Sequence, residues 1–357
     1  MAGGGTGGHI FPAIAIANAI KKKAPATGIL FVGAKGKMEM EKVPQAGYNI
    51  KGLTIAGYNR SSLIKNISLP FKLVYSFFQV AGIFRKFKPT AVIGVGGYSS
   101  YPVLRYAQAK GIATFIHESN SFAGKSNILL GKKAILVFTG GIGMETFFPA
   151  AKVVVSGNPV RTSIIEDNMP QPDARKYFDL DPGKPVILFV GGSLGAKNIN
   201  EALLQHIMLL LQEGYQVIWQ TGKAYKEKAI SVAAGKQGVY ISDFITNMEH
   251  AYKAAEIVVS RSGAMAVAEL CVVKKPVVFV PFPFAAEDHQ TVNAQRLVDI
   301  NAAMMVKDNA AISTLIPSVL QLMKDEKKKM ELSTNIARMS ITNADDIIAD
   351  KILEKLS

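Results

Sequence analysis

The sequence predicts an α/β protein with two domains, each built around a parallel sheet. Short apolar runs, most of them rich in Val and Ile, alternate with longer helix-like stretches, which is the pattern of βα units. The 31 glycines are spread between these runs, where turns are expected. With 357 residues, 49% hydrophobic and 19% charged, the chain reads as globular and is too long for one ordinary core.

Two series of apolar runs mark the expected strands. The first falls at 29–33, 91–95, 113–117 and 135–138, with a helical run at 10–23 before the first strand and helical segments between the strands. The second falls at 186–190, 217–220, 239–241, 257–260 and 277–280. Because the turn-rich segment Ser156-Gly157-Asn158-Pro159 separates the two series, we place the first domain at residues 1–157 and the second at 158–340.

The cysteine content and the hydropathy pattern bear on location. Cys271 is the one cysteine, so no intramolecular disulfide forms and the reducing cytoplasm is the expected compartment. Its apolar neighbours predict a buried, unreactive thiol. Residues 1–8 have neither the charged nor the apolar region of a signal peptide, and no run of about 20 apolar residues predicts a spanning helix. Any contact with a membrane is therefore expected at its surface.

The net charge of +14 is confined to the first domain. Residues 1–157 contain 19 Lys and Arg against 4 Asp and Glu, whereas the remaining residues contain 22 against 23. No acidic residue occurs between Glu41 and Glu118. A field of this kind attracts an anionic surface or substrate.

Three glycine-rich loops, at 3–9, 94–100 and 191–196, each follow or begin near a strand and precede a helix. Glycine lets backbone N–H groups approach phosphate oxygens, and the helix dipole favours negative charge there. A single such loop can equally serve a tight turn, but three together favour anion sites. The spacing does not match a Walker motif, and no acidic residue follows the first loop at the distance typical of ribose binding, which disfavours a kinase or a dinucleotide dehydrogenase.

Over nearly the whole chain these motifs resemble the MurG family, which transfers N-acetylglucosamine (GlcNAc) from UDP-GlcNAc to lipid I in peptidoglycan synthesis. The resemblance rests on the segments 4–13, 94–98, 117–120, 157–161, 191–196, 260–264 and 287–290, together with Glu269 and Asn293. It implies the GT-B fold, two Rossmann-like domains facing a cleft, with a C-terminal helix at about 341–357 completing the first domain. It also implies a peripheral enzyme on the cytoplasmic face of the bacterial plasma membrane, with roles in cell shape and division.

The chain departs from the family pattern at two points. The family has a full strand before the first glycine loop, whereas this sequence starts two residues before Gly3, which leaves open whether residues precede Met1. The family usually has Gln at the position of Ser119, so one polar side chain beside Asn120 is shorter here.

The resemblance places UDP-GlcNAc on the second domain. There the start of the helix after 191–196 would hold the diphosphate, Glu269 the ribose hydroxyls, and the backbone of Ile245 the uracil. Arg261 is either a nucleotide contact or a structural ion-pair residue. The full set of implied donor contacts is Thr6, Gly7, Gly8, Asn120, Arg161, Ser193, Ile245, Arg261, Ala264, Met265, Ala266, Val267, Ala268, Glu269, Gln290 and Asn293.

No obligatory metal or other cofactor is expected. The segment Asp179-Leu180-Asp181 has the form of an Asp-x-Asp metal motif, but it lies in the polar stretch before Pro182-Gly183 and is read as a surface loop. Helix dipoles and Arg side chains can instead stabilise the departing UDP.

The transfer reaction needs a general base for the attacking hydroxyl. His9, directly after the first glycine loop, is the first choice, although a histidine at a helix start can also be a capping or packing residue. Glu118, at a strand end, is the alternative base. The acceptor, lipid I, itself contains a diphosphate, for which the expected contacts are Thr6, Gly7, Gly8, Gly96, Gly97, Tyr98 and Ser99.

The segment 69–87 connects the charge to the membrane. It is too short and too charged to span a bilayer, and it suits a helix with one face in the core and part of the other at the lipid interface. A fully buried helix with snorkelling lysines is the alternative. The residues expected at the membrane are Phe71, Phe77, Phe78, Phe84, Arg85, Lys86 and Lys88.

Two other functions remain open at this stage. A GT-B transferase with another lipid or small-molecule acceptor would have a similar donor half. A nucleic-acid-binding protein would also be basic, but the positive segment is interleaved with bulky aliphatic residues and lacks RRM or zinc-finger signatures. The resemblance implies UDP-GlcNAc, lipid I and other cell-wall enzymes as partners. The charge pattern adds an anionic membrane surface, and no nucleic acid is expected.

Overall fold

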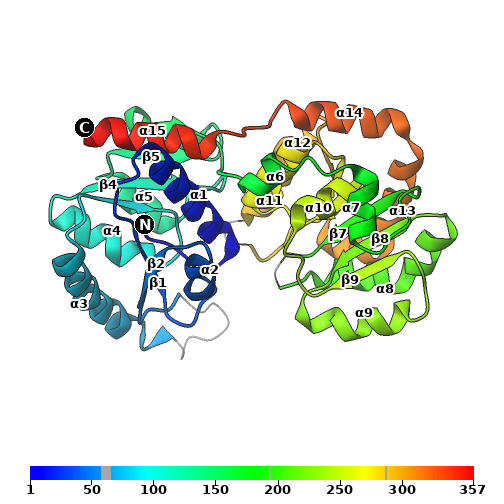
Figure 1. Ribbon diagram of the computed structural model, residues 1–357, viewed down its shortest axis with the longest axis horizontal. Helices are drawn as coiled ribbons and strands as arrows, with labels where there is room; N and C mark the ends of the chain where they lie inside the picture. The colour runs from blue at the N-terminus through cyan, green and yellow to red at the C-terminus, as the bar shows by residue number, and fades with distance from the viewer. Residues whose placement is uncertain (58–65, 193, 286–287) are drawn as a thin grey trace. The chain divides into compact units, whose positions relative to one another are not determined.

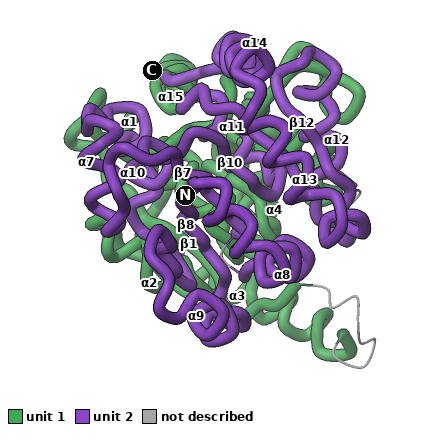
Figure 2. The backbone as a smooth tube through the Cα atoms, turned by 90° about the vertical axis from the view of Figure 1, so that its right-hand side faces the viewer, with its two compact units in different colours: residues 1–161, 343–357 green, residues 162–342 purple. Residues whose placement is uncertain are grey.

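A computed structural model of the chain describes residues 1–57, 66–192, 194–285 and 288–357. It consists of two compact units, coloured separately in Figure 2: unit 1 comprises Met1–Arg161 and Asn343–Ser357, and unit 2 comprises Thr162–Thr342. The chain thus enters unit 2 after Arg161, where the sequence suggested residue 157, and leaves it after Thr342, where the sequence suggested residue 340. The predicted class, two α/β domains with parallel sheets, is confirmed.

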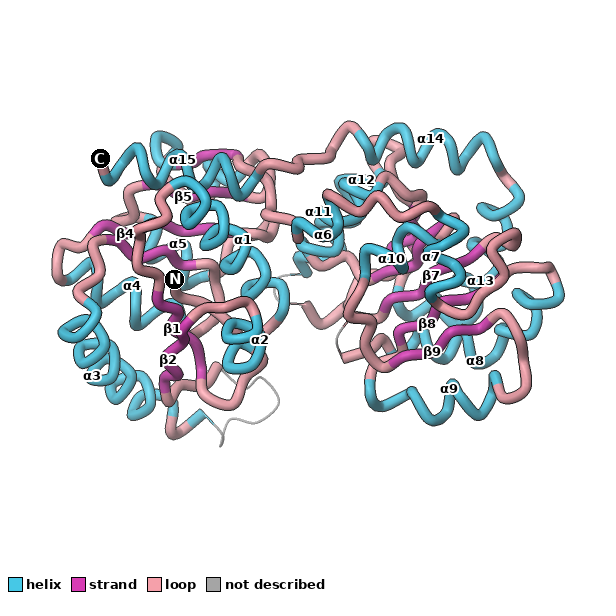
Figure 3. The backbone as a smooth tube through the Cα atoms, viewed as in Figure 1, coloured by secondary structure: helices cyan, strands magenta, loops and turns pink. Residues whose placement is uncertain are grey.

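Unit 1 contains a parallel sheet whose central position is occupied by the first residues of the chain (Figures 1 and 3). Ala2 forms bridges to Val32 on one side and to Gly94 on the other. Its N–H donates to the carbonyl of Ile93 (2.8 Å), and its carbonyl accepts from the N–H of Val95 (3.0 Å). The strands are β1 Leu30–Ala34, β2 Asn49–Leu53, β3 Ala91–Gly94, β4 Ala113–Glu118, β5 Leu136–Thr139 and β6 Val153–Val155, paired β1-β2 and β3-β4-β5-β6.

Two strands of this sheet, β2 and β6, were not predicted from the sequence. β2 and β6 lie at the two ends of the strand order, where part of each strand is solvated. β2 contains only two apolar side chains, Ile50 and Leu53, and β6 is three residues long. Neither therefore has the sustained apolar run by which the buried strands are recognised.

Helices cover both faces of this sheet, because successive strand residues point to opposite sides. Val92, Ile116 and Val137 pack into one core cluster with residues of α3, α4 and α5. Ile93, Phe115 and Phe138 pack into a second cluster with residues of α1 and α15. The helices of unit 1 are α1 Gly7–Lys23, α2 Glu39–Gln45, α3 Leu69–Phe87, α4 Ser100–Ala109, α5 Lys125–Gly131 and α15 Ala344–Leu356.

The helix α15 lies alongside α1, although more than 300 residues separate the two in sequence (Figure 1). Ile348, Ala349 and Ile352 are buried against α1. At the C-terminal end of α1, Lys23 Nζ forms ion pairs with Asp346 (3.1 Å) and Asp350 (2.9 Å). The last helix therefore contributes to the core of unit 1.

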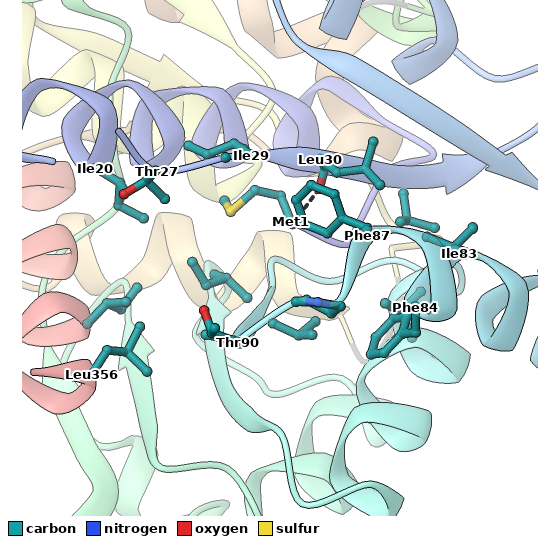
Figure 4. Close-up of a pocket in the computed structure, with 18 of the residues that line it drawn as sticks. Met1, Ile20, Thr27, Ile29, Leu30, Ile83, Phe84, Phe87, Thr90 and Leu356 are labelled. Atoms are coloured by element: carbon teal, nitrogen blue, oxygen red, sulfur yellow. Dashed lines mark hydrogen bonds between the residues drawn. The ribbon is translucent and has the colours of Figure 1, made fainter. Parts of the chain in front are cut away.

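Unit 1 also encloses an apolar cavity of about 290 Å³ (Figure 4). Side chains of α3 and α15, among them Phe84, Phe87 and Leu356, line it, and the amino group of Met1 donates to the carbonyl of Leu30 (2.9 Å) within it. Burial lowers the pKa of this amino group to about 5. None of the residues that line the cavity belongs to the loops 3–9 or 94–100.

Unit 2 has a six-stranded parallel sheet in the order β12-β11-β10-β7-β8-β9. A core cluster that includes Trp219 joins the buried strands to α8 and α13. The strands are β7 Val186–Val190, β8 Gln216–Gln220, β9 Val239–Ser242, β10 Ile257–Ser260, β11 Val277–Phe279 and β12 Met304–Met305. The helices are α6 Thr162–Ile165, α7 Gln171–Tyr177, α8 Lys197–Gln212, α9 Lys226–Ala233, α10 Met248–Ala254, α11 Ala264–Val273, α12 His289–Val298, α13 Ala311–Lys324 and α14 Glu326–Ala337.

Three further predictions are confirmed: the bounds of helix α3, the surface loop with Asp179 and Asp181, and the buried Cys271. Helix α3 has the predicted bounds, with Pro70 in its first turn and Lys88 in a left-handed conformation after its end. Asp179 and Asp181 are exposed in the loop before β7, and Cys271 is buried in α11. Among the residues that the structure describes, no helix is both long and apolar enough to cross a bilayer.

Candidate functional site

The glycine loops 3–9 and 94–100, both in unit 1, lie against each other. A Cβ atom at Gly97 would lie 2.4 Å from the carbonyl oxygen of Gly4, and a Cβ at Gly96 would lie 2.9 Å from the ring of His9. Both Gly96 and Gly97 also have positive φ, at 94° and 83°. Only glycine fits these two positions, so the loops are built to bring the backbone at Gly4 and the ring of His9 together.

The start of α1 has the geometry of an anion site. Thr6 is the extended N-cap residue and its side chain makes no capping hydrogen bond, while the first turn, which includes Gly7 and Gly8, contains no acidic residue. The first N–H groups of a helix have no partner within the helix, and the helix dipole favours an anion near them. In the neighbouring loop Tyr98 packs near Gly5 and Gly57, whereas Ser99 is buried.

His9 is held by the backbone of the first loop. Its Nδ1 lies 3.1 Å from the carbonyl oxygen of Gly4. Because a carbonyl oxygen only accepts hydrogen bonds, this contact places the proton of the neutral ring on Nδ1 and the lone pair on Nε2. His9 therefore has the tautomer that a base acting through Nε2 requires.

Glu118, the alternative base, is engaged in the loop that follows β4. Its side chain is 4% exposed, and its two oxygens accept from the backbone N–H groups of Asn120 (3.1 Å) and Gly124 (3.0 Å). They also accept from the side-chain amides of Asn120 (3.3 Å) and Asn127 (2.9 Å). A carboxylate with four donors around it orders a loop, and this arrangement favours His9 as the base.

His117 is a buried histidine that links two motifs of unit 1. Its Nε2 lies 3.4 Å from the carbonyl of Gly157, and the hydroxyl of Ser119 lies 3.4 Å from its Nδ1. Asn158 donates to the carbonyl of Ser119 (3.0 Å), so residues 117–120 and 157–158 form one assembly. Burial lowers the pKa of His117 to about 4, so the ring is neutral at physiological pH.

Arg161, the last residue of unit 1 before the chain enters unit 2, contacts α1. Its guanidinium stacks over the ring of Phe11 in α1, with 5.3 Å between the guanidinium carbon and the ring centroid. This contact brings Arg161 to the first turns of the helix that begins with the glycine loop.

In unit 2 the residues 191–192 and 194–196 follow the carboxyl end of β7, the edge at which open α/β sheets bind ligands. A Cβ at Gly195 would lie 2.2 Å from the carbonyl oxygen of Thr221, so this loop and the end of β8 are in close contact. α8 begins directly after Ala196, without a side-chain cap. Ser193, the predicted diphosphate contact, lies outside the described residues.

The side chain of Gln220 links Gly192 in the glycine loop to Ile245, the predicted contact to uracil. Its side-chain amide donates to the carbonyl of Gly192 (3.0 Å), and its oxygen accepts from the backbone N–H of Ile245 (3.0 Å). The backbone N–H of Ile245 is thus already paired, while its side chain is buried.

The start of α11 gathers several predicted donor contacts. Gly263 is the N-cap residue, and Ala264, Met265 and Ala266 begin the first turns, followed by Val267 and Ala268. The hydroxyl of Ser262 donates to the carbonyl of Gln290 (2.8 Å), and the amide of Asn293 donates to the carbonyl of Ser262 (3.0 Å). Gln290 and Asn293, both in α12, are therefore anchored beside the N-terminus of α11.

Two charged side chains of unit 2 differ in their surroundings. Glu269 is buried in α11 and accepts a hydrogen bond from the hydroxyl of Tyr252 (3.1 Å). Arg261 forms an ion pair with Asp308 (2.6 Å) and donates to the carbonyls of Val280 and Pro281. The sequence left open whether Arg261 is a nucleotide contact or a structural ion-pair residue, and the structure contains the ion pair.

Three residues of the site were not found from the sequence: Gln220, Tyr252 and Glu39, whose carboxylate accepts a hydrogen bond from the backbone N–H of Gly5 in the first glycine loop (2.9 Å). Gln220 and Tyr252 act through contacts between distant segments, for which no local motif exists. One feature of the sequence could have drawn attention to Glu39: it and Glu41 are the only acidic residues in the first 117 positions.

Comparisons with known proteins agree with this geometry. Residues 1–139 match the glycosyltransferase family 28 N-terminal domain, and residues 186–349 match the family 28 C-terminal domain. Relatives from Phocaeicola vulgatus (46% identical, 99% of this chain, 95% of the relative) and Flavobacterium psychrophilum (48%, 99% and 96%) are named UDP-N-acetylglucosamine–N-acetylmuramyl-(pentapeptide) pyrophosphoryl-undecaprenol N-acetylglucosamine transferase. The crystal structure of Acinetobacter baumannii MurG is similar, with a TM-score of 0.77 and 29% identity over 99% of this chain and 98% of that one.

The two parallel-sheet units and the two family matches define a glycosyltransferase of the GT-B class. The fold is shared more widely, since a UDP-GlcNAc 2-epimerase from Neisseria meningitidis bound to UDP-GlcNAc matches with a TM-score of 0.67 at 15% identity. Within this class, the chain belongs to the MurG family.

Proposed function

We propose that the chain transfers GlcNAc from UDP-GlcNAc to the 4-hydroxyl of the N-acetylmuramyl sugar of lipid I (undecaprenyl-pyrophosphoryl-MurNAc-pentapeptide), giving lipid II for peptidoglycan synthesis. The observation that carries this proposal is the identity of 46–48% over 99% of the chain to relatives named for that reaction. Cell-wall assembly, and with it cell shape and division, would depend on the product.

His9 is the proposed base of an inverting displacement. Its Nε2 takes the proton of the attacking hydroxyl while the hydroxyl oxygen bonds to the anomeric carbon, and the bond from that carbon to the UDP oxygen breaks with its electron pair. The contact between His9 Nδ1 and the Gly4 carbonyl (3.1 Å) supports this role, because it orients the ring and stabilises the protonated form.

The leaving UDP would be stabilised by unit 2. The N-termini of α8 and α11, neither capped by a side chain, are suited to the diphosphate, and the buried carboxylate of Glu269 is suited to the ribose hydroxyls. We propose no obligatory metal. The described residues contain no group of three or more His, Cys, Asp or Glu side chains placed to hold one.

The acceptor would be held by unit 1. Gly7 and Gly8 at the start of α1, with Gly96 and Gly97 beside them, are suited to the diphosphate of lipid I. The lipid chain would lie in an anionic leaflet, to which the basic first domain is attracted. Binding at the cytoplasmic face of the membrane, near other cell-wall enzymes, follows from this acceptor.

Helix α3 is the proposed membrane contact. Phe71 and Phe78 are 76% and 72% exposed, and Val74 and Tyr75 between them are also exposed, so one face of the helix is apolar and solvated. Arg85, Lys86 and Lys88 are exposed near its end, whereas Phe77 is half-buried. Phe84 is buried and packs against Tyr106 (ring centroids 5.2 Å apart), so it is removed from the predicted membrane set.

The test is incubation of the purified protein with UDP-GlcNAc and a lipid I analogue, followed by detection of UDP and of the β-linked disaccharide. A diacylglycerol and a small aglycone serve as competing acceptors. We expect transfer to the lipid I analogue only, and loss of turnover with unchanged UDP affinity in His9→Ala. Transfer to another acceptor in its place would contradict the proposed acceptor, and normal turnover of His9→Ala would remove His9 as the base.

A further inference from the structure

Glu39, the first residue of α2, is a buried carboxylate to which the proposed reaction gives no role. Its side chain is only 1% exposed. Oε1 accepts from the N–H of Ala34 at the end of β1, and Oε2 accepts from the N–H of Gly5 in the first glycine loop, both at 2.9 Å. One carboxylate thus joins the sheet to the loop that precedes α1.

The surrounding backbone is shaped to admit this carboxylate. A Cβ at Gly4 would lie 2.2 Å from Glu39 Oε1, and a Cβ at Gly33 would lie 2.5 Å from Glu39 Cγ. Gly4 also has a φ of 148°, which side chains rarely allow. Two glycines therefore leave the space that Glu39 fills, as expected of a position that must hold a carboxylate close to the main chain.

Glu39 and His9 contact the same peptide group. The N–H of Gly5 donates to Glu39, and the carbonyl of Gly4, on the other side of that peptide bond, lies 3.1 Å from His9 Nδ1. Hydrogen bonds in such a chain polarise one another, so a negative charge at the N–H end makes the carbonyl a stronger acceptor. The peptide is also planar, so fixing its N–H end fixes the direction of its carbonyl.

We propose that Glu39 is a positioning residue that acts through the Gly4–Gly5 peptide to hold the proton of His9 on Nδ1 and to orient Nε2. This inference rests on the proposed function, in which Nε2 of His9 takes the proton of the acceptor hydroxyl. Glu39 itself touches neither the acceptor nor the donor in this scheme.

The test compares Glu39→Gln with Glu41→Gln in the full-length protein. Both changes remove one negative charge from α2, but the side chain of Glu41 is 66% exposed. Nitrogen-15 NMR of histidine-labelled protein reports the tautomer of His9, whose signal is assigned by its loss in His9→Ala. We expect Nδ1–H in the wild type and in Glu41→Gln, and a mixture of tautomers in Glu39→Gln. Turnover in Glu39→Gln should fall about 10- to 100-fold with KM for UDP-GlcNAc unchanged.

The outcomes separate the inference from the proposed function. An unchanged tautomer in a folded Glu39→Gln protein overturns the inference, whether or not turnover falls. A protein that transfers no GlcNAc, but in which the His9 tautomer depends on Glu39, overturns the proposed function and leaves the positioning contact standing. If Glu39→Gln does not fold, Glu39→Asp replaces it: the charge is kept, but the shorter side chain cannot reach both N–H groups, so mixed tautomers are still expected. Nδ1–H alone in Glu39→Asp would overturn the inference.

Discussion

The carbonyl oxygen of Gly4 occupies the place that a side chain at Gly97 would need, only 2.4 Å from the expected Cβ position. Gly111 provides the matched comparison, because its φ is also positive (70°, against 83° at Gly97) but nothing lies within 4 Å of its Cβ position. The two glycines thus share a positive φ and differ in the space around them.

We expect Gly111→Ala to lower the free energy of unfolding by about 1–2 kcal/mol, the cost of an L-residue in this conformation. Gly97→Ala should lose roughly 1–3 kcal/mol more, because the first glycine loop must move. Urea denaturation measures both values, and turnover should fall only in Gly97→Ala. Equal destabilisation by the two changes would show that the loops do not depend on this close approach.

Removal of the Glu269 charge tests the proposed ribose contact. Glu269→Gln keeps the size of the side chain and an acceptor for Tyr252, but it loses the strong hydrogen bonds that a carboxylate makes to a diol. We expect the Kd for UDP to rise about 10- to 100-fold by calorimetry. Glu227→Gln, an exposed change in α9, serves as the control.

A modified ligand makes this test specific. The wild type should bind 2′-deoxy-UDP more weakly than UDP, whereas Glu269→Gln should bind the two almost equally, because the lost hydroxyl then has no carboxylate partner. If Glu269→Gln still discriminates between the two ligands as the wild type does, another residue holds the ribose.

The pKa of His117 predicts how stability depends on pH. Burial lowers this pKa from 6.5 in the unfolded chain to about 4 in the folded protein, so the folded state favours the neutral ring. Its contribution is complete above pH 6.5 and is lost as the pH falls from 6.5 toward 4, at about 1.4 kcal/mol per pH unit.

Urea denaturation between pH 7.5 and pH 4.5 measures this slope. His117→Gln cannot take up a proton, so its stability should fall less steeply over that range, whatever its absolute value at pH 7.5. Parallel slopes in the wild type and His117→Gln would mean that the ring is not held neutral by burial.

The exposed face of α3 predicts membrane binding that depends on two phenylalanines. Replacing both Phe71 and Phe78 by Ser should reduce binding to anionic vesicles at least tenfold, because each ring buried in lipid contributes about 1.5–3 kcal/mol. Met330→Ser, at a 71% exposed position of α14, is the control and should bind like the wild type. Flotation at low and high salt measures binding, and unchanged flotation of the double variant would exclude this face.

Much of the fold could be predicted because its signals are local. Helix α3 is rich in apolar residues over its whole length and has a proline in its first turn. The edge strands β2 and β6 were missed because half-solvated strands lack long apolar runs. The glycine loops were recognised from their composition, but their mutual contact arises from the sheet, which places the ends of neighbouring strands together.

The candidate site was harder to predict wherever a residue acts through tertiary contacts. Glu39 lies 34 residues from Gly5, and Gln220 lies 25 residues from Ile245, so no motif spacing connects either pair. Glu118 is the alternative base by its place at a strand end, but the sequence does not indicate the four hydrogen-bond donors that surround its carboxylate.

The packing of α15 on α1 sets an order of assembly. Unit 2 is one continuous stretch of chain and can close its core as soon as that stretch has left the ribosome. Unit 1 can complete its core only after α15 has been synthesised, because Ile348 and Ile352 pack in the same core cluster as residues of α1, the helix that contains His9. Unit 1, whose synthesis begins first, therefore completes its core last. Under the proposed function, a nascent chain could bind UDP-GlcNAc through unit 2 before α1 and His9 are ordered.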